Sequence, residues 1–420
     1  MVTRRDFIST LSAALGSSAI AASAGEKTIL LKSAWDTINI GDIGHTPGTL
    51  RILEEHLPDV RVIVWAMQLN ERITAMLRRR FPKVDIVQGR VDVNGAPLDA
   101  PIKAAFARAD LFIHNSSMSH GTSLLAWCRK AGKPCGMYGQ SYSPSFVEGD
   151  AGKANIELLN SAAFVYCRDG NTLAMLMKAG VKPSVLEFAP DGCFGIDVRD
   201  DVRALAFMRK AGLVDRKFIT IQLRTNTNKH PGKDGAPLNP LHPTPQQKAD
   251  DERRAAVLRE VITAWVKKTG HKVLIAPEVE KEMVHNNRLL REPLPEEIKS
   301  HVVTPDAFWN ADEAASVFAR AHTAVCHEPH SLIIALANGT PILHTYSEFH
   351  SPKCWMFRDI GLPDWMLEMD STPAARMADA LFAIDADYPA ALAKVKKAMD
   401  FVYQRQADTV RVVGRLLGRV

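Results

Sequence analysis

Short apolar, β-branched runs alternate with amphipathic stretches along the first part of the chain. Alternation of strands with helices is typical of a parallel sheet with crossover helices. The pattern therefore predicts an α/β domain over residues 25–199. The runs expected to form its strands are Thr28–Ser33, Val60–Trp65, Asp85–Val87, Leu111–His114, Pro134–Tyr138 and Ala163–Cys167, with helical stretches such as Thr49–Leu57 and Asn70–Arg80 between them.

The same alternation begins again after a helical segment at Asp200–Ala211, and it predicts a second α/β domain over residues 200–385. A strongly helical stretch, Ala374–Leu417, ends the chain, and its last part, 386–420, is expected to close back over the first domain. The expected strands are Lys217–Leu223, His271–Ala276, Val302–Thr304, Ala324–Cys326 and Pro341–Thr345, and the expected helices are about Asp250–Lys268, Asp312–Ala321 and Ser331–Asn338.

One long segment, Thr225–Lys248, is rich in Pro, Asn, Gly and Lys and follows the first strand of the second part. Loops that leave the carboxyl ends of parallel strands face the ligand crevice, and loops of this length are usually functional or disordered. Two interpretations stay open: a mobile lid or an inert insertion.

The first 24 residues differ from the rest of the chain. Arg4 and Arg5 form a twin-arginine pattern, an apolar run follows, and Ala22-Ser23-Ala24 has the form of a cleavage site. This pattern predicts a signal peptide for the twin-arginine translocation machinery and export to the periplasm or cell envelope. The alternative is an unstructured or amphipathic tail on a cytoplasmic protein. No other stretch is apolar for about 18 residues, so no transmembrane helix is expected.

Composition indicates a soluble globular protein, with 46% hydrophobic and 24% charged residues and a net charge of only +5. Basic and acidic residues are interleaved, so we expect no nucleic-acid partner. The six cysteines show no C-x-x-C spacing, which argues against a zinc site. Export permits disulfides, but cysteines in apolar runs are more often buried free thiols.

The stretch from His327 to Pro341 carries the strongest chemical signal. It follows an apolar strand and opens a helix of small residues, with His330 at the helix start and Lys353 further on. A helix N-terminus presents free backbone N–H groups and the positive end of the helix dipole, which suit a phosphate or carboxylate. The pattern predicts a transferase-type site for a small anionic donor.

Several short motifs together resemble the polysaccharide pyruvyl transferase family over nearly all of residues 28–385. The resemblance implies two Rossmann-like domains facing across a cleft, in a glycosyltransferase B-like arrangement, with no cofactor and no metal. The motifs are Asn39-Ile40-Gly41-Asp42, Asp110-Leu111-Phe112-Ile113, Gly139-Gln140-Ser141-Tyr142-Ser143-Pro144, Arg168-Asp169-Gly170-Asn171-Thr172 with Leu176 and Gly180-Val181, Asp191 with Phe194, and His330 with Ala335-Leu336, Gly339, Pro341, Tyr346 and Lys353.

Two positions depart from the family pattern. Glu328 stands where the family commonly has Arg, and a Glu there would repel an anion. The segment from Asn115 to Gly121 replaces a turn that is often rich in glycine. Both departures bear on which donor and acceptor the chain uses.

The resemblance implies transfer of a pyruvyl group from phosphoenolpyruvate, as a ketal, to two hydroxyls of an envelope or exopolysaccharide glycan. His330 is expected to be the general acid, because His titrates near neutral pH, unless it is a structural histidine. Asp42 is expected to bind or deprotonate the acceptor, or else to cap a helix. His327-x-x-His330 lacks the spacing of a helical zinc motif, so no metal is expected.

Four residues are expected to bind the donor and three the acceptor. The guanidinium of Arg168 suits a carboxylate or phosphate, although a salt bridge to Asp169 or Asp191 is the alternative. The donor-binding set is Arg168, Lys353, Arg224 and Ser331, and the acceptor-binding set is Asn39, Asp42 and Gln140.

Export conflicts with the expected donor, since phosphoenolpyruvate is a cytoplasmic metabolite. Three interpretations remain. The protein is a pyruvyl transferase whose signal is imperfect or retained, an exported glycosyltransferase-like enzyme with another donor, or an exported glycan-binding protein without catalysis. Glu328 favours the second and third, and His330, Arg168 and Lys353 together favour the first.

Overall fold

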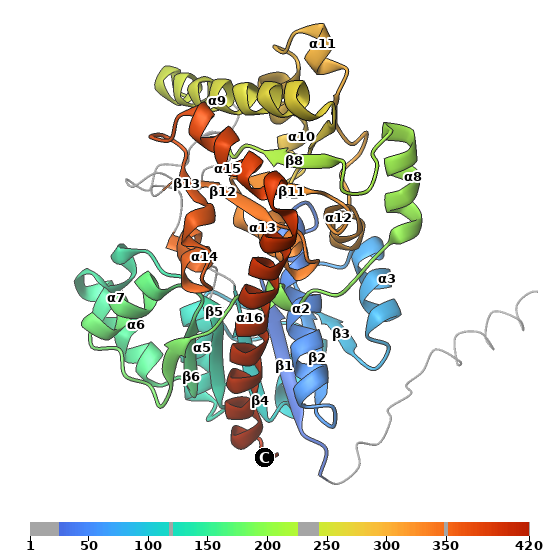
Figure 1. Ribbon diagram of the computed structural model, residues 1–420. Coiled ribbons are helices and arrows are strands. Elements are labelled where there is room, and N and C mark those ends of the chain that lie inside the picture. Colours follow the sequence, from blue (N-terminus) through green and yellow to red (C-terminus); the bar gives the residue numbers. More distant parts are fainter. Residues whose placement is uncertain (1–24, 117–120, 226–242, 348–351, 420) are drawn as a thin grey trace, which may run out of the picture.

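The computed structural model describes residues 25–116, 121–225, 243–347 and 352–419. Within these residues the strands form two sheets, each parallel throughout (Figure 1). The first has the order β3-β2-β1-β4-β5-β6-β7 and the second β10-β9-β8-β11-β12-β13. Helices connect successive strands, so the expected α/β architecture of two Rossmann-like domains is confirmed.

The strands of the first sheet are β1 (Thr28–Ser33), β2 (Arg61–Ala66), β3 (Asp85–Gln88), β4 (Leu111–Asn115), β5 (Cys135–Gln140), β6 (Phe164–Cys167) and β7 (Leu186–Phe188). Those of the second are β8 (Phe218–Gln222), β9 (Lys272–Ile275), β10 (Val302–Val303), β11 (Thr323–Cys326), β12 (Ile342–Tyr346) and β13 (Met366–Glu368). The sequence pattern missed β7 and β13, because each is a three-residue edge strand, too short to show a period.

The helices of the first domain are α2 (Ile40–His56), α3 (Glu71–Arg80), α4 (Ala100–Arg108), α5 (Gly121–Lys130), α6 (Gly149–Asn160) and α7 (Gly170–Lys178), with short turns η1 (Pro144–Val147) and η2 (Gly192–Gly195). Those that follow are α8 (Asp201–Ala211), α9 (Pro245–Thr269), α10 (Glu282–Asn286), α11 (Glu296–Lys299), α12 (Ala311–Phe318), α13 (Pro329–Ala337), α14 (Met356–Asp359), α15 (Ala374–Ala386) and α16 (Tyr388–Leu416). Further single turns are η4 (Asn287–Arg291), η5 (Pro352–Trp355) and η6 (Pro363–Trp365). None of the helices in the described part combines the length and apolar character needed to span a bilayer.

Helix α16 connects the two domains, and Figure 1 shows it in red, crossing the front of the first domain. Near its start, the hydroxyl of Tyr388 donates to the backbone of His322 in the second domain. Near its end, Thr409 lies 2.9 Å from the hydroxyl of Tyr138 on β5 of the first domain. The C-terminal helix therefore closes back over the first domain.

Helix α2 begins at Ile40, nine residues earlier than the pattern predicted, so the motif Asn39-Ile40-Gly41-Asp42 lies at the start of a helix. The side chain of Asn39 is the N-cap and accepts from the backbone N–H groups of Gly41 and Asp42. The first half of the helix contains three glycines and Pro47, residues of low helix propensity, which explains why the period was not visible.

Close packing explains why glycines occupy this half of α2. A Cβ at Gly41 would lie 2.4 Å from the ring of His330 on α13, and one at Gly48 would lie 2.2 Å from the carbonyl oxygen of Gly192 on η2. Tertiary contact therefore overrides helix propensity here.

The two domains are also joined along the backbone beside α2. The backbone N–H of Ile40 donates to the carbonyl of Glu278, and that of Glu280 donates to the carbonyl of Ile38, each at 2.9 Å. Further contacts are made by ion pairs such as Arg79–Asp312 at 2.7 Å. The domains are thus in contact where α2 meets the loop after β9 and the start of α13.

All six cysteines are buried and none forms a disulfide within the described residues, as expected from their apolar surroundings. Most of the segment expected to be either a lid or an insertion, residues 226–242, lies outside the described residues, as does the proposed signal peptide.

We predict that Gly48→Ala destabilises the protein. Helix propensity alone would make this change stabilising by about 1 kcal/mol, whereas overpacking against the backbone of Gly192 should cost about 1–3 kcal/mol. The sign of the change in unfolding free energy, measured by denaturant titration, decides between the two effects. A more stable variant would contradict the packing argument.

Candidate functional site

His330 forms a buried pair with Glu278 where the domains meet. His330 lies in the first turn of α13, and Glu278 lies in the loop that follows β9. The Nδ1 atom of His330 is 3.0 Å from Oε1 of Glu278, and the two side chains are only 5% and 1% exposed. Gly41 packs directly against the imidazole ring from the other domain.

Burial determines where the proton of this pair resides. Burial and the nearby charge of Glu328 raise the pKa of Glu278 from 4.5 to about 8. Burial and the charge of Lys353 lower the pKa of His330 well below its usual value. At neutral pH, Glu278 therefore carries the proton and donates it to Nδ1 of a neutral imidazole. The other nitrogen, Nε2, then bears a hydrogen, and it is buried with no hydrogen-bond partner among the described residues.

Glu278 also occupies the N-terminus of α13, where the sequence predicted a donor anion. Its Oε2 accepts from the backbone N–H of Ser331 at 2.7 Å and from the Ser331 hydroxyl at 3.0 Å. In this structure Ser331, expected to bind the donor, binds a carboxyl group of the protein itself.

A second internal carboxylate, Glu328, contacts two of the cations expected to bind the donor. Arg224 lies just beyond β8 and Lys353 lies in η5. Arg224 pairs with Oε1 of Glu328, and Lys353 lies 3.5 Å from Oε2. Burial opposes ionisation of Glu328, but Arg224 and Lys353 outweigh it and lower its pKa to about 2. Glu328 is therefore a fixed anion of the site.

Arg168, also expected to bind the donor, is paired with Asp191, the second of the two partners considered from the sequence. Its Nη1 is 2.7 Å from Oδ2 of Asp191, and both side chains are buried. Oδ1 of Asp191 lies 2.9 Å from Nδ1 of His45 on α2. The His45 ring meets the His330 ring edge-on at 4.8 Å between centroids. Buried polar groups thus extend from Arg168 to Glu278 across the domain contact.

His45, Asp191 and His330 bring one donor atom each to within 4.8 Å of one another. Two imidazoles and a carboxylate are a common set of metal ligands. However, Arg168 already holds one oxygen of Asp191, and its positive charge opposes a bound cation. The expectation of no metal stays a prediction.

The residues expected to bind the acceptor lie in different places. Asn39 caps α2, and Asp42 lies in the first turn of that helix, one residue beyond the glycine that contacts His330. Gln140 is buried at the end of β5, where its amide donates to the carbonyls of His114 and Tyr138. Asp42 is therefore near the domain contact, whereas the amide of Gln140 joins neighbouring strands.

Glu328 lies in a small pocket at the carboxyl ends of β8, β11 and β12. The cavity measures only about 10 Å³, close to the minimum of roughly 10–15 Å³ needed for one water. A ligand can enter only if side chains move. The pocket is lined by Arg224, His327, Glu328, Pro329, His344, Ser347, Lys353 and Cys354.

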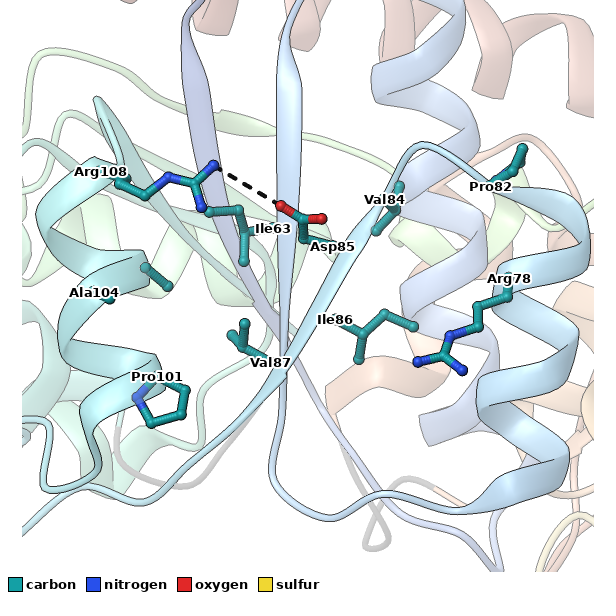
Figure 2. A pocket seen from close by; sticks show the side chains of 11 residues that line it. Ile63, Arg78, Pro82, Val84, Asp85, Ile86, Val87, Pro101, Ala104 and Arg108 are labelled. Carbon is teal, nitrogen blue, oxygen red and sulfur yellow. Dashed lines mark ion pairs between the residues drawn. The ribbon is translucent and has the colours of Figure 1, made fainter. Parts of the chain in front are cut away.

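Larger hollows lie elsewhere, and two of them lie beside β3. Figure 2 shows one of about 610 Å³, in which Arg108 of α4 reaches toward Asp85, the first residue of β3, at 3.9 Å. The other, of about 880 Å³, also includes Asp85 and the start of β2 at Arg61. Ligands of parallel sheets bind outside the carboxyl ends of the strands. The first hollow runs along the edge strand β3 and the second lies at the amino ends of β2 and β3, so neither is the candidate site.

The sequence reasoning missed Glu278, His45 and Gln222. Gln222, the last residue of β8, accepts through Oε1 from the backbone N–H groups of His327 and Glu328 and so positions the start of α13. Glu278 could have been noticed, since it follows the expected strand His271–Ala276 at its carboxyl end, where site residues gather. His45 gave no such signal, because its helix was not recognised.

The fold is that of glycosyltransferase B-type enzymes. The UDP-bound MnaA of S. aureus shares 10% identity at a TM-score of 0.58, covering 94% of this chain and 98% of that one. A Neisseria meningitidis UDP-GlcNAc 2-epimerase bound to UDP-GlcNAc shares 10% identity at 0.55, covering 93% and 100%. The E. coli ADP-heptose LPS heptosyltransferase II shares 13% at 0.50, covering 86% and 99%. No curated protein sequence matches the chain.

A sequence comparison shows the family to which the chain belongs. The model of the polysaccharide pyruvyl transferase family matches residues 39–347, which include α2, the Arg168 motif and the start of α13, and the chain belongs to this family. Membership supports a glycan-modifying transferase.

We predict that Glu278→Gln keeps the fold but changes how stability depends on pH. A Gln amide reproduces the protonated acid, with N–H donating to His330 and C=O accepting from Ser331. The pKa of Glu278 is raised from 4.5 to about 8, so its contribution to stability is full below about pH 4.5 and is lost as pH rises through about 8.

Denaturant unfolding at a series of pH values tests this prediction. Between about pH 4.5 and 8 the wild type should lose more stability than Glu278→Gln. Glu282, whose pKa is raised to about 8 by burial and by the charges of Glu328 and Glu278, is present in both proteins and loses only the Glu278 contribution in the variant. Parallel pH profiles for the two proteins would contradict a protonated Glu278.

Proposed function

We propose that this protein transfers the pyruvyl group of phosphoenolpyruvate to two hydroxyls of a saccharide in an envelope or exopolysaccharide glycan. The methylene carbon gains a proton and becomes a methyl group, two sugar oxygens bond to the central carbon as a ketal, and inorganic phosphate leaves. The observation that carries the proposal is the buried Glu278–His330 pair, within the region that matches the family.

The pair supplies what the first step needs, a proton held at neutral pH and delivered through an imidazole. Glu278 passes its proton to Nδ1 of His330 while Nε2–H of His330 donates to the methylene carbon. The imidazole remains neutral throughout, which suits a group whose protonated form is disfavoured by burial. His330 thus acts as the general acid with Glu278 as its proton source.

Remaining roles follow from position. Arg224, Lys353 and Arg168 are the cations that would hold the phosphate and carboxylate of the donor, once released from Glu328 and Asp191. Asp42, on the other side of the domain contact, would receive the proton of the attacking hydroxyl. Because His330 is buried, the domains must part for substrate to reach Nε2.

A sugar-nucleotide donor is the second candidate, and Glu328 favours it. A carboxylate accepts hydrogen bonds from hydroxyls of a sugar, and two structural neighbours were solved with UDP or UDP-GlcNAc. A screen of thermal stability separates the candidates, since a ligand at 100 times its Kd stabilises by about 2.7 kcal/mol. A shift with phosphoenolpyruvate supports pyruvyl transfer, one with UDP-GlcNAc supports glycosyl transfer, and one with oligosaccharide alone supports a glycan-binding protein.

We predict that His330→Ala lowers pyruvyl transfer roughly 100- to 10,000-fold, the usual contribution of a general acid, and that Glu278→Gln lowers it as well. The assay measures phosphate release and ketal formation from phosphoenolpyruvate and an envelope glycan. Asp370→Asn, which removes a carboxylate paired with Arg253 and Arg254 outside the candidate pocket, is the control and should keep its rate. Full activity of Glu278→Gln would refute its role as proton source.

We further propose that the chain is exported by its twin-arginine signal and cut after Ala24. Mass spectrometry of the protein purified from its native host should then show a chain that starts at Gly25. A protein that retains Met1 and fractionates with the cytoplasm would refute export and would remove the conflict with a cytoplasmic donor.

A further inference from the structure

Arg224 and Lys353 come from separate segments and converge on Glu328. One follows β8 and the other lies in η5, yet both contact the carboxylate at the N-cap position of α13. Glu328 is only 4% exposed, and its side chain makes no capping hydrogen bond to the helix. The Glu328 carboxylate therefore serves the two cations rather than the helix.

We propose that Arg224 and Lys353 form a phosphate-binding site whose resting ligand is the carboxylate of Glu328, and that a phosphate-bearing donor binds by displacing it. The inference rests on the proposed function only for the identity of the donor. Binding of inorganic phosphate tests it without any turnover.

Three polar atoms of residues that line the pocket have no hydrogen-bond partner in the described part of the chain, which favours the binding of a polar ligand here. Nε of Arg224, Oγ of Ser347 and Nδ1 of His344 are buried without hydrogen-bond partners among the described residues. Such groups are unfavourable unless something binds them. Arg224 and Ser347 offer N–H and O–H donors.

His344 offers an acceptor. Its Nε2 lies 3.2 Å from the carbonyl oxygen of His327, and burial lowers its pKa to about 3, so the ring is neutral and Nε2 carries the hydrogen. Nδ1 is then a lone-pair acceptor. A phosphate group that keeps one proton can accept from the two donors and donate to the one acceptor beside the two cations. An ionised carboxylate can only accept, so it would leave Nδ1 of His344 without a donor.

The size of the pocket and the hydrogen bonds that hold its backbone indicate how a phosphate would displace the carboxylate of Glu328. A cavity of about 10 Å³ has no room for a phosphate while the Glu328 side chain fills it. Gln222 holds the backbone N–H groups of His327 and Glu328. The backbone therefore stays in place, and only the side chain of Glu328 has to rotate away.

Because Glu328 is attached to the chain, its carboxylate competes strongly with free anions for Arg224 and Lys353. An attached carboxylate has a high effective concentration, in the millimolar range or above, so free carboxylates such as pyruvate should compete poorly. A phosphate carries more charge and more acceptor oxygens, and it can displace the tether. Glu328 would thus restrict the site to phosphate-bearing ligands.

The experiment titrates inorganic phosphate and pyruvate, by calorimetry at fixed ionic strength, into the wild type and Glu328→Gln. Phosphate should bind Glu328→Gln roughly 10- to 100-fold more tightly than it binds wild type. Pyruvate should bind the variant measurably and the wild type hardly at all. Equal or weaker phosphate binding by the variant would overturn the proposal.

Thermal unfolding gives a second signature. Glu328→Gln removes a carboxylate that pairs with two half-buried cations, so its Tm should fall, and added phosphate should restore it. Asp370→Asn is the matched control, since Asp370 also lies between two cations and also has a pKa of about 2, held there by Arg254 and Arg253. Phosphate should not restore its Tm, and equal recovery in both variants would overturn the proposal.

Ser347→Ala keeps all ion pairs and removes only the unpartnered hydroxyl, so it tests the site even if Glu328→Gln fails to fold. Phosphate should bind this variant several-fold more weakly than wild type, and unchanged binding would overturn the proposal. A chain that binds phosphate as described and transfers no pyruvyl group would refute the proposed function and leave this inference standing.

Discussion

The first turn of α2 lies so close to His330 that residue 41 has no room for a side chain. Backbone hydrogen bonds between residues 38–40 and 278–280 hold the loop after β9 against the same turn. Together these contacts place Glu278 beneath α13 and remove its carboxyl group and the imidazole from water. Because burial is the leading cause of both pKa shifts, the proton held by Glu278 depends on the packing of a glycine-rich helix from the other domain.

Every positive group that the sequence assigned to the donor has a carboxyl partner from the chain itself. Asp191 pairs with Arg168, Glu328 with Arg224 and Lys353, and Glu278 with the N-terminus of α13. A buried cation without a counter-ion is strongly unfavourable, so an empty anion site in a closed interface needs such partners. From the sequence, Glu328 was expected to repel an anionic donor. In the structure it is the counter-ion of Arg224 and Lys353.

The α/β alternation in the sequence was sufficient to predict two parallel sheets, because buried parallel strands give continuous apolar runs. It failed for β7 and β13, which are too short, and for the first half of α2, where packing against His330 and Gly192 requires glycine. The family motifs identified Arg168, His330 and Lys353 as candidate site residues. Their partners were out of reach, because Glu278 is 52 residues away from His330 in the sequence and His45 meets His330 only across the domain contact, and no local pattern encodes either contact.

In the proposed reaction, the exchange of ion-pair partners would be coupled to the separation of the two domains. A substrate that reaches Nε2 of His330 must separate α2 from α13, and separation exposes the imidazole and Glu278 to water, which favours the ionised carboxyl group. The free energy for separation has to come from ligand contacts that are stronger in the open state than in the closed one. In the proposed reaction, Arg224 and Lys353 would supply such contacts when they exchange the carboxylate of Glu328 for a phosphate. Closure around the bound donor would then restore burial and return the proton to Glu278 when the methylene carbon is in place to receive it.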